Sequence, residues 1–494
     1  MNEMEHYDLC VIGGGASGYA AAMRAIDFGK KVLLVERDKI GGAAIFNGAL
    51  SSKTMWEYSE KVAAVRSEQS NFEVDFEKLR RVVDEAVHEK KVQMDVHITL
   101  LKKEAKLRTL YMERGNAKLV TPHIVSIEKE DQITKEIHAD FILLATGSRP
   151  RILPNIPADG EVILTSDDID NLKEFPKSMV ILGAGVIGCE FATIFSNFGK
   201  TKVYIIDKAE RILPFEDEDV STMVSQNMEQ NGVFIHKNST LLRMEIKDGQ
   251  VEYELKNSDG SNSVMRVEKA LISVGRVANI EHIGLEAVGI KITERGSVWD
   301  DDTKTSVDNI YVAGDLTSEI ALVNVAEREA RHAVVRMFST PPKPLVYKNI
   351  STIMFLNPEV ASVGMGEQEA IQKGISYKVA KIDYSTITRA IAMRKTKGFF
   401  KILVSNDSEM KILGMRAIGE HASSAIQAVA LLIYMNKGID ELAHMLHPHP
   451  SIIEGIQECA RMLLGKSIYK SSMFKDKLKC YSYENGVITP LENL

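Results

Sequence analysis

Two copies of one glycine-rich pattern constrain this chain more than any other feature of its sequence. Residues 9–36 and residues 179–207 each contain an apolar stretch, a glycine turn, a helical stretch, Phe-Gly-Lys, a second apolar stretch and an acidic residue. This order is typical of a βαβ unit that binds a dinucleotide at a parallel sheet. The repeat therefore predicts an α/β fold with two Rossmann-like dinucleotide-binding domains. The glycines recur 170 residues apart as Gly13 and Gly183, Gly15 and Gly185, Gly18 and Gly188, and Gly29 and Gly199.

The residue types in each copy suit a bound dinucleotide. The first glycine permits a tight turn, the second lets the backbone approach a pyrophosphate, and the third lets the helix pack closely on the strand. Free N–H groups at the start of the helix then face the phosphates. Glu36 and Asp207 end the second strands, where a carboxylate accepts hydrogen bonds from ribose hydroxyls. Because both copies are complete, we set aside the alternative that these turns bind no ligand.

Two nucleotide sites in one chain predict two cofactors that exchange a hydride. The first site is the better FAD candidate, because Asp315 follows a later apolar strand and its carboxylate is placed to hold the flavin's ribityl chain or pyrophosphate. A turn or cap role for Asp315 is the alternative. At the second site, Asp207 favours NAD(H), since a carboxylate repels the 2′-phosphate of NADP(H). The nearby Lys208 and Arg211 keep NADP(H) open as a second choice.

Composition excludes several classes of partner. The 494 residues carry a formal net charge of −7, so no basic field attracts nucleic acid. No apolar run is long enough for a membrane span. The first predicted strand begins within ten residues of Met1, so we expect no leader peptide. The length predicts three domains. The sequence has four scattered cysteines, Cys10, Cys189, Cys459 and Cys480. So few cysteines fit a reducing compartment, and we expect a cytoplasmic location.

Seven motifs, with the two glycine turns among them, occur in a fixed order along most of the chain. They are GGGASG at 13–18, ATG at 145–147, GAGVIGCE at 183–190, GRVAN at 275–279, T-x4-IYVAGD at 305–315, NPEVASVG at 357–364 and HPHPSIIE at 447–454. In order and spacing the chain resembles the flavoprotein disulfide reductase family, and most closely its dihydrolipoamide dehydrogenase branch. The resemblance extends to about residue 470.

The resemblance implies a domain plan and a set of cofactors. It implies an FAD-binding domain at 1–148 and 276–345, an NAD(P)-binding domain at 149–275 and an α+β dimerisation domain at 346–470. It also implies a homodimer in which each active site is completed by the other subunit. Residues 471–494 are polar with little pattern, and we expect a disordered tail or one held by a partner. The resemblance places the remaining cofactor contacts at Gly42, Lys53, Thr146, Gly147, Gly275, Asp315 and Leu322.

The chain departs from the family at the centre of its chemistry. The family carries two redox cysteines in a segment that corresponds to residues 41–53. Here Ala44 and Ala49 stand at those positions, and Phe46 and Asn47 replace the usual neighbours. Attack on a disulfide needs a thiolate, so reduction of a disulfide substrate is not expected.

Four ionisable residues of the family pattern are retained. The resemblance places Lys53 near the flavin, paired with Glu190, and makes His449 and Glu454 an acid–base pair. Each has a structural alternative: Lys53 as an exposed helix lysine, Glu190 as a first-turn helix acid, and Glu454 as part of a capping box that starts at Ser451. If Glu454 only caps the helix, His449 has a structural role as well. The sequence predicts no metal site.

These features predict an FAD-containing NAD(P)H oxidoreductase of diaphorase type. Electrons pass from NADH through FAD directly to a small-molecule, non-disulfide acceptor such as a quinone. Two alternatives remain open at this stage. One is a soluble pyridine nucleotide transhydrogenase, and the other is a catalytically impaired, flavin-binding structural subunit that resembles dihydrolipoamide dehydrogenase.

Overall fold

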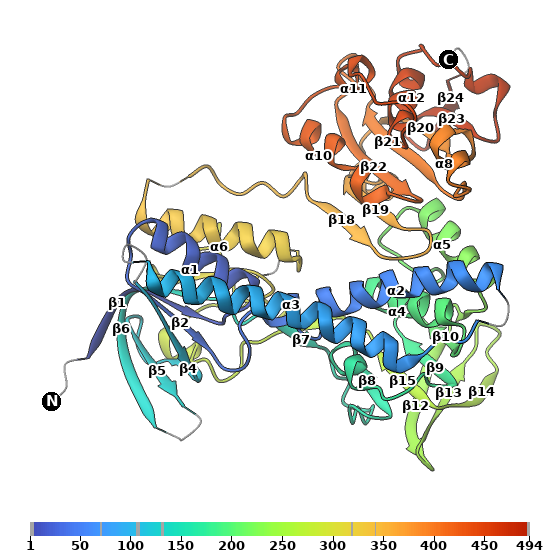
Figure 1. The fold of residues 1–494 in the computed structure, drawn as a ribbon. Helices are drawn as coiled ribbons and strands as arrows, with labels where there is room; N and C mark the ends of the chain where they lie inside the picture. Colours follow the sequence, from blue (N-terminus) through green and yellow to red (C-terminus); the bar gives the residue numbers. More distant parts are fainter. Residues whose placement is uncertain are drawn as a thin grey trace. The chain divides into compact units, whose positions relative to one another are not determined.

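The structure is a computed structural model that describes residues 4–69, 72–104, 109–129, 133–317, 320–340 and 342–491 (Figure 1). The chain forms two compact units. Unit 1 contains Met1–Tyr58, Asn71–Phe175 and Ile272–Leu345, and unit 2 contains Ser59–Ser70, Pro176–Leu271 and Val346–Leu494.

Unit 1 is built on a mixed sheet whose central strands are parallel. The strand order is β3-β2-β1-β6-β5-β4, and β17 pairs with β6. Strands β1, β2, β3, β6 and β17 pair in parallel, whereas β4, β5 and β6 pair antiparallel. The strands are β1 (Glu5–Ile12), β2 (Val32–Glu36), β3 (Leu110–Arg114), β4 (Asn116–Leu119), β5 (Ile124–Glu128), β6 (Thr134–Leu144) and β17 (Ile310–Val312). The first predicted βαβ unit therefore lies at the centre of this sheet.

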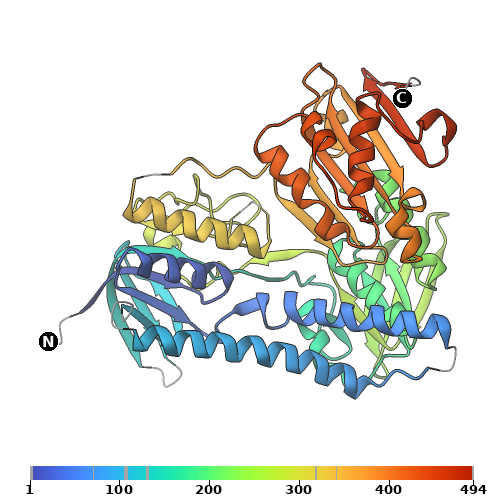
Figure 2. The ribbon, with the colours of Figure 1, turned by 45° about the horizontal axis from the view of Figure 1, so that its top comes forward.

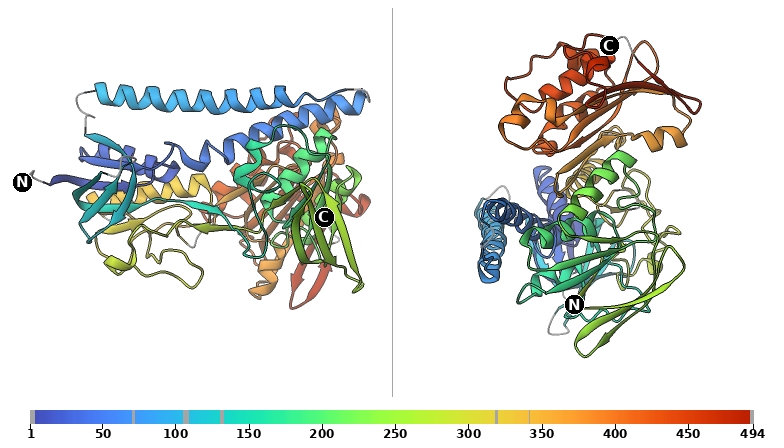
Figure 3. Two further views of the ribbon diagram at one scale, coloured as in Figure 1. Left: turned by 90° about the horizontal axis from the view of Figure 1, so that it is seen from below. Right: turned by 90° about the vertical axis from the view of Figure 1, so that its right-hand side faces the viewer.

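Helices α1 (Ala16–Asp27) and α6 (Val323–Phe338) lie side by side against this sheet (Figure 1). Small side chains let them pack closely, because Ala22 and Ala25 share one buried cluster with Ala330. Two longer helices follow the first βαβ unit in the chain, α2 (Ala49–Glu68) and α3 (Phe76–Lys103). Helix α3 is long and nearly straight (Figure 3).

Unit 1 also contains several short elements that lie outside its main sheet. Strands β7 and β16 pair antiparallel with each other. These elements are η1 (Gly42–Ala44), β7 (Ser148–Pro150), β8 (Ile163–Thr165), η3 (Ser166–Asn171), β16 (Arg276–Ala278) and η4 (Glu286–Val288).

Unit 2 contains the second βαβ unit. Strands β9, β10 and β11 pair in parallel, with β15 on the other side of β9. A separate antiparallel sheet has the order β12-β13-β14. The elements are β9 (Ser178–Leu182), α4 (Val186–Phe198), β10 (Lys202–Ile206), α5 (Glu218–Gln230), β11 (Phe234–His236), β12 (Thr240–Lys247), β13 (Gln250–Lys256), β14 (Asn262–Val267) and β15 (Lys269–Ile272).

The C-terminal part of unit 2 is an antiparallel sheet with the order β18-β19-β22-β21-β20-β23-β24, covered by helices (Figure 2). Its strands are β18 (Ser351–Met354), β19 (Val360–Gly364), β20 (Tyr377–Asp383), β21 (Phe399–Ser405), β22 (Ile412–Ile418), β23 (Leu478–Glu484) and β24 (Val487–Pro490). Its helices are α7 (Glu367–Gln372), η5 (Tyr384–Thr386), α8 (Thr388–Ala392), α9 (Ala422–Ala425), α10 (Gln427–Tyr434), α11 (Asp440–His444), α12 (Glu454–Leu463) and η6 (Ser471–Met473).

The expectation of a disordered tail at 471–494 is wrong for the residues described there. Strand β23 pairs with β20 in the sheet, and β24 pairs with β23 as a hairpin (Figure 2). Leu478 and Cys480 point into the C-terminal core and are almost fully buried. An edge hairpin needs only one buried face, so its sequence is mostly polar and gives little apolar signal.

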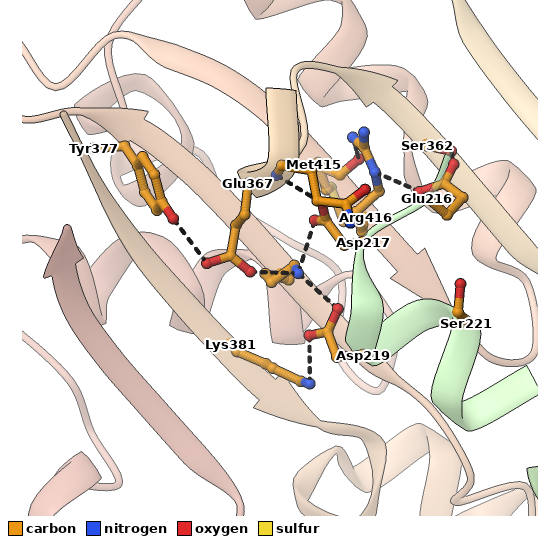
Figure 4. Close-up of polar contacts among 12 residues, drawn as sticks. Glu216, Asp217, Asp219, Ser221, Ser362, Glu367, Tyr377, Lys381, Met415 and Arg416 are labelled. Atoms are coloured by element: carbon orange, nitrogen blue, oxygen red, sulfur yellow. Dashed lines mark hydrogen bonds and ion pairs between the residues drawn. The ribbon is translucent and has the colours of Figure 1, made fainter. Parts of the chain in front are cut away.

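A buried lysine joins helix α5 to the C-terminal sheet within unit 2. The side chain of Lys401, on β21, is fully buried. Its Nζ lies 2.8 Å from Asp217, 2.7 Å from Asp219 and 2.7 Å from Glu367. Figure 4 shows these three carboxylates converging from two helix starts. Burial acts to lower the pKa of Lys401, but the carboxylates outweigh it and raise that pKa. The ammonium group therefore stays charged.

Replacing this lysine by an apolar residue should destabilise unit 2. Lys401→Met leaves three close carboxylates without their shared cation, which should lower the free energy of unfolding by about 3–5 kcal/mol. The matched control is Lys381→Met, because Lys381 also bonds Asp219 but is 22% exposed and should cost much less. Urea unfolding followed by circular dichroism measures both. Equal stability of Lys401→Met and the unsubstituted protein would contradict this account.

Candidate functional site

The two glycine turns have nearly identical geometry. Gly13 and Gly183 have φ angles of 105° and 104°, a backbone conformation that residues other than glycine rarely adopt. Helices α1 and α4 begin after Gly15 and Gly185, and no side chain in the described part of the chain caps either start. A Cβ atom on either of these two glycines would meet nothing within 4 Å. Each helix start thus has uncapped N–H groups next to open space, which suits a pyrophosphate.

One carboxylate holds each turn from the end of the second strand. Glu36 accepts hydrogen bonds from Gly14 N at 2.6 Å and Asp38 N at 2.7 Å. Asp207 accepts the matching pair, from Ala184 N at 2.6 Å and Ala209 N at 2.8 Å. These bonds keep each carboxylate at the carboxyl end of its strand, next to the glycine turn. That is the position from which an acidic residue reaches a ribose.

In unit 1, other backbone segments approach the first glycine turn too closely for side chains. A Cβ on Gly18 would lie 1.8 Å from Gly13 O, and one on Gly13 would lie 2.3 Å from Ala145 O. Gly41 donates its N–H to Gly14 O at 2.8 Å. A Cβ on Gly42 would lie 3.1 Å from Gly15 Cα. The predicted residue Gly42 is therefore brought against the predicted turn.

A polar network holds Asp315 beside the same part of unit 1. Ser148 Oγ donates to Asp315 at 2.5 Å and accepts from Arg276 Nε at 2.8 Å. A Cβ on Gly314, the residue before Asp315, would lie 3.1 Å from Ser17 Oγ at the start of α1. Asp315 therefore lies close to the glycine turn, and its contact with the flavin stays a prediction. Ser148 was not predicted as a site residue, although it directly follows the ATG motif.

The remaining predicted contacts of unit 1 lie on connecting segments. Thr146 Oγ1 donates to Asn279 O at 2.7 Å, and Gly147 O accepts from Asn279 N at 2.9 Å. Gly275 accepts a hydrogen bond from Arg151 N at 3.0 Å. Leu322 directly precedes α6 and accepts a hydrogen bond within its first turn. The structure places these residues at strand and helix ends.

The segment that begins at Gly41 forms a short turn of helix and then the start of α2. Phe46 N donates to Gly42 O at 2.9 Å, and the Phe46 ring lies 5.1 Å from Lys39 Nζ. Ala44 is half-buried and Ala49 is exposed within this single chain. Residues 41–53 contain no cysteine. This segment therefore offers no sulfur next to the glycine turn.

The four cysteines lie elsewhere, as free and buried thiols. Burial raises the pKa of Cys10 and of Cys480 to about 12. Burial also raises the pKa of Cys189 and of Cys459. A thiol with a raised pKa stays protonated near neutral pH and is a poor nucleophile. The structure thus gives none of these cysteines the character of a redox thiolate.

Lys53 and Glu190 belong to different units, so their expected pairing stays a prediction. Lys53 is half-buried on α2. Glu190 is 6% exposed, and its Oε1 accepts a hydrogen bond from Phe355 N at 3.0 Å. The reading of Glu190 as a first-turn acid is wrong, because α4 begins at Val186 and has no acidic residue in its first turn. Its carboxylate is instead buried within unit 2.

His449 and Glu454 form a hydrogen-bonded pair at the start of α12. His449 Nδ1 lies 2.8 Å from Glu454 Oε1, and the histidine side chain is 67% exposed. Burial acts to raise the pKa of Glu454, but hydrogen bonds from Ser451 N and His449 outweigh it and lower that pKa. The predicted capping box is only half formed: Ser451 N donates to Glu454, but Ser451 Oγ has no hydrogen-bond partner in the part of the chain that the structure describes. The ring nitrogen Nε2 of His449 is left for another partner.

Two single substitutions separate folding from flavin binding. In Gly18→Ala the added methyl group would clash with the backbone oxygen of Gly13. This substitution should therefore lower the melting temperature of unit 1. Gly15→Ala adds its methyl group to open space, so the apoprotein should melt as before. It should lose flavin, because the methyl group blocks the approach of the pyrophosphate. Melting curves of the apoprotein and visible absorbance of bound flavin measure both effects. Full flavin retention by Gly15→Ala would contradict this assignment.

Comparison with known proteins gives one consistent family. The family model for pyridine nucleotide-disulphide oxidoreductases matches residues 7–330, and the model for the dimerisation domain of that family matches residues 350–460. A dihydrolipoyl dehydrogenase of Bacillus subtilis (strain 168) is 32% identical over 479 residues, covering 94% of this chain and 99% of that protein. A dihydrolipoyl dehydrogenase of Chlamydia muridarum is 31% identical over 474 residues, covering 94% and 98%.

Solved structures agree with this result. LpdA from Mycobacterium tuberculosis superposes with a TM-score of 0.83 at 26% identity, covering 93% of this chain and 99% of that chain. The HOCl-induced flavoprotein disulfide reductase RclA from Escherichia coli gives a TM-score of 0.81 at 25% identity, covering 92% and 100%. The predicted fold class is confirmed: two Rossmann-like domains and a C-terminal α+β dimerisation domain.

The predicted cofactors also agree with the family, whose members bind FAD and NAD(H). The match to the dimerisation-domain model supports a homodimer. Among the described residues, no helix has both the length and the apolar character needed to cross a membrane. With two cofactor turns of matching geometry and family models that cover most of its length, this chain belongs to the pyridine nucleotide-disulphide oxidoreductase family.

Proposed function

We propose that this chain is an FAD-dependent NADH oxidoreductase whose flavin passes electrons directly to a small-molecule acceptor such as a quinone. The observation that carries the proposal is the absence of cysteine from residues 41–53, where the family keeps its redox pair. Ala44 and Ala49 occupy the two cysteine positions. The relatives from Bacillus subtilis and Chlamydia muridarum are dihydrolipoyl dehydrogenases, and reduction of a disulfide requires a thiolate that this segment lacks.

The two glycine turns supply the two cofactor sites. The turn of unit 1 would hold FAD, with Glu36 on its ribose and Asp315 on its ribityl or pyrophosphate region. The turn of unit 2 would hold NADH, with Asp207 on its ribose. FAD held at the turn of unit 1 would supply the chemistry that takes a hydride from NADH and passes the electron pair to the acceptor. With a quinone the reaction balances as NADH, one proton and quinone giving NAD⁺ and quinol.

The surroundings of Asp207 support NADH over NADPH. A 2′-phosphate needs a free cation near this carboxylate. Arg211 is the strongest cationic candidate, but its guanidinium already donates to Glu216 O at 2.7 Å and to Ser221 Oγ at 2.5 Å. Those bonds hold the side chain against the start of α5. Lys208 is exposed and is the only other cation that the sequence pattern suggested there.

Two retained pairs have proposed roles in this reaction. Lys53 would place a positive charge near the reduced flavin, with Glu190 as its partner. His449, oriented by Glu454, would deliver the proton that the acceptor takes up. The geometry that supports this role is the Nδ1 bond to Glu454, which leaves Nε2 of an exposed ring available. In the proposed homodimer this histidine serves the site of the other subunit.

The domain limits predicted from the sequence are part of the same proposal.

A panel of acceptors tests the proposed function. The purified yellow protein should oxidise NADH rapidly with quinones and should not turn over with lipoamide. Ala44→Cys/Ala49→Cys restores both sulfur positions and should add lipoamide turnover. Ala44→Ser/Ala49→Ser is the matched control, because serine adds polarity without redox chemistry and should add none. Steady-state loss of NADH absorbance measures all three proteins.

Two results would contradict the proposal. The first is lipoamide turnover by the unsubstituted protein. The second is NADH oxidation that no acceptor raises above the rate of free flavin, which would point to a structural subunit. Reduction of an NAD analogue by NADPH would instead indicate a transhydrogenase.

A further inference from the structure

A cluster of metal-binding side chain types lies in unit 1, away from the glycine turn. His6 is on β1, and His138 and Asp140 are on β6; we call these three residues the His6 cluster. Strands β1 and β6 pair in parallel with His6 opposite His138. Side chains alternate along a strand, so His138 and Asp140 share one face of the sheet. The register therefore brings together residues that are more than 130 positions apart in the sequence.

The ligand atoms of the His6 cluster are close to one another. One nitrogen or oxygen atom from each residue lies within 4.8 Å of the other two. His6 Nε2 lies 2.8 Å from Asp140 Oδ1. His138 Nδ1 is buried and has no hydrogen-bond partner among the described residues. A third imidazole, of His123, stacks on the His138 ring at 5.4 Å, while His6 stacks on its other side at 5.0 Å.

We propose that the His6 cluster binds a divalent transition-metal ion such as Zn²⁺. Two imidazole nitrogens and one carboxylate oxygen are ligands that Zn²⁺, Co²⁺, Ni²⁺ and Cu²⁺ accept, whereas Mg²⁺ and Ca²⁺ prefer oxygen alone. With metal–ligand bonds of about 2.0–2.1 Å, tetrahedral ligands lie about 3.4 Å apart. The side chains of His6 and Asp140 are about half exposed, so they can rotate to bring the ligand atoms from within 4.8 Å to this shorter separation. Water would complete the coordination.

Hydrogen bonds from His123 and Asn309 hold the β6 backbone beside the His6 cluster. His123 Nδ1 lies 2.9 Å from Ala139 O, between the two ligands on β6, and 3.2 Å from Asn309 Nδ2. Asn309 Nδ2 also donates to Asp140 O at 3.1 Å. These contacts fix the backbone and the stacked ring next to the cluster.

The position of the His6 cluster points to a structural role. His6 lies near the start of β1, and Gly13 follows the end of that strand. Seven residues of extended chain place the cluster roughly 20 Å from the glycine turn. A metal ion there would join β1 to β6 without contact with the nucleotide. The acidic cluster of Asp217, Asp219 and Glu367 differs, because the Lys401 ammonium already fills it.

Metal titration of the chelator-treated, flavin-containing protein tests the proposal. Calorimetry should show one Zn²⁺ site, and its affinity should fall by at least about 100-fold in His6→Ala and Asp140→Asn. Loss of a group that only orients a metal ligand already lowers metal affinity by up to that factor. Co²⁺ should give a ligand-field absorption band that both variants lose. Zn²⁺ should raise the melting temperature of the unsubstituted protein and not that of His6→Ala. His6 is exposed, so this variant should fold and keep its flavin.

Two control variants identify adventitious sites. His88→Ala removes an exposed histidine of α3, and His449→Ala removes the histidine near Glu454; both should retain the Zn²⁺ site and the Co²⁺ band. Unchanged Zn²⁺ affinity in His6→Ala and Asp140→Asn would overturn the proposal. Loss of the site in His449→Ala, with the His6 variants unaffected, would overturn it as well. Failure of the acceptor panel would leave this result untouched, because the readout does not involve turnover.

Discussion

In both nucleotide sites, one carboxylate fixes the shape of the glycine turn. Glu36 and Asp207 each accept two backbone N–H groups, one from the turn itself and one just beyond the second strand. Charge-assisted bonds of this kind are stronger than neutral ones. They hold the turn open at the start of the helix while the other glycines allow strand, helix and neighbouring loops to touch. The same interaction therefore shapes the proposed phosphate site and holds the carboxylate where the proposed ribose contact needs it.

Around this shared frame, the proposed function depends on one short segment of unit 1, residues 41–53. Gly41 and Gly42 still pack against the first turn, and α2 still begins close behind them. Ala44 ends the short helix η1 and Ala49 begins α2, and alanine suits both positions because it is small and a good helix former. Under the proposed function, the architecture of the family persists without a sulfur relay. The proposed direct transfer to an acceptor uses what this frame retains.

The features that the sequence predicted well are local. Each βαβ unit is encoded within about 30 neighbouring residues, so spacing alone predicts both turns and both acids. Long-range pairing is not encoded in that way. The His6 cluster depends on the register of β1 with β6, and the hairpin at β23 and β24 depends on an edge of β20. Lys401 interrupts an otherwise apolar strand, and only the fold shows why a buried cation belongs there.

The number of electrons that the protein takes up per flavin tests the central claim most directly. An anaerobic titration with dithionite, followed by visible absorbance, measures it. Without a redox disulfide, two electrons should bleach the flavin completely, and no long-wavelength thiolate–flavin band should appear on the way. Uptake of four electrons, with such a band after the first two, would show a working sulfur pair and contradict the account.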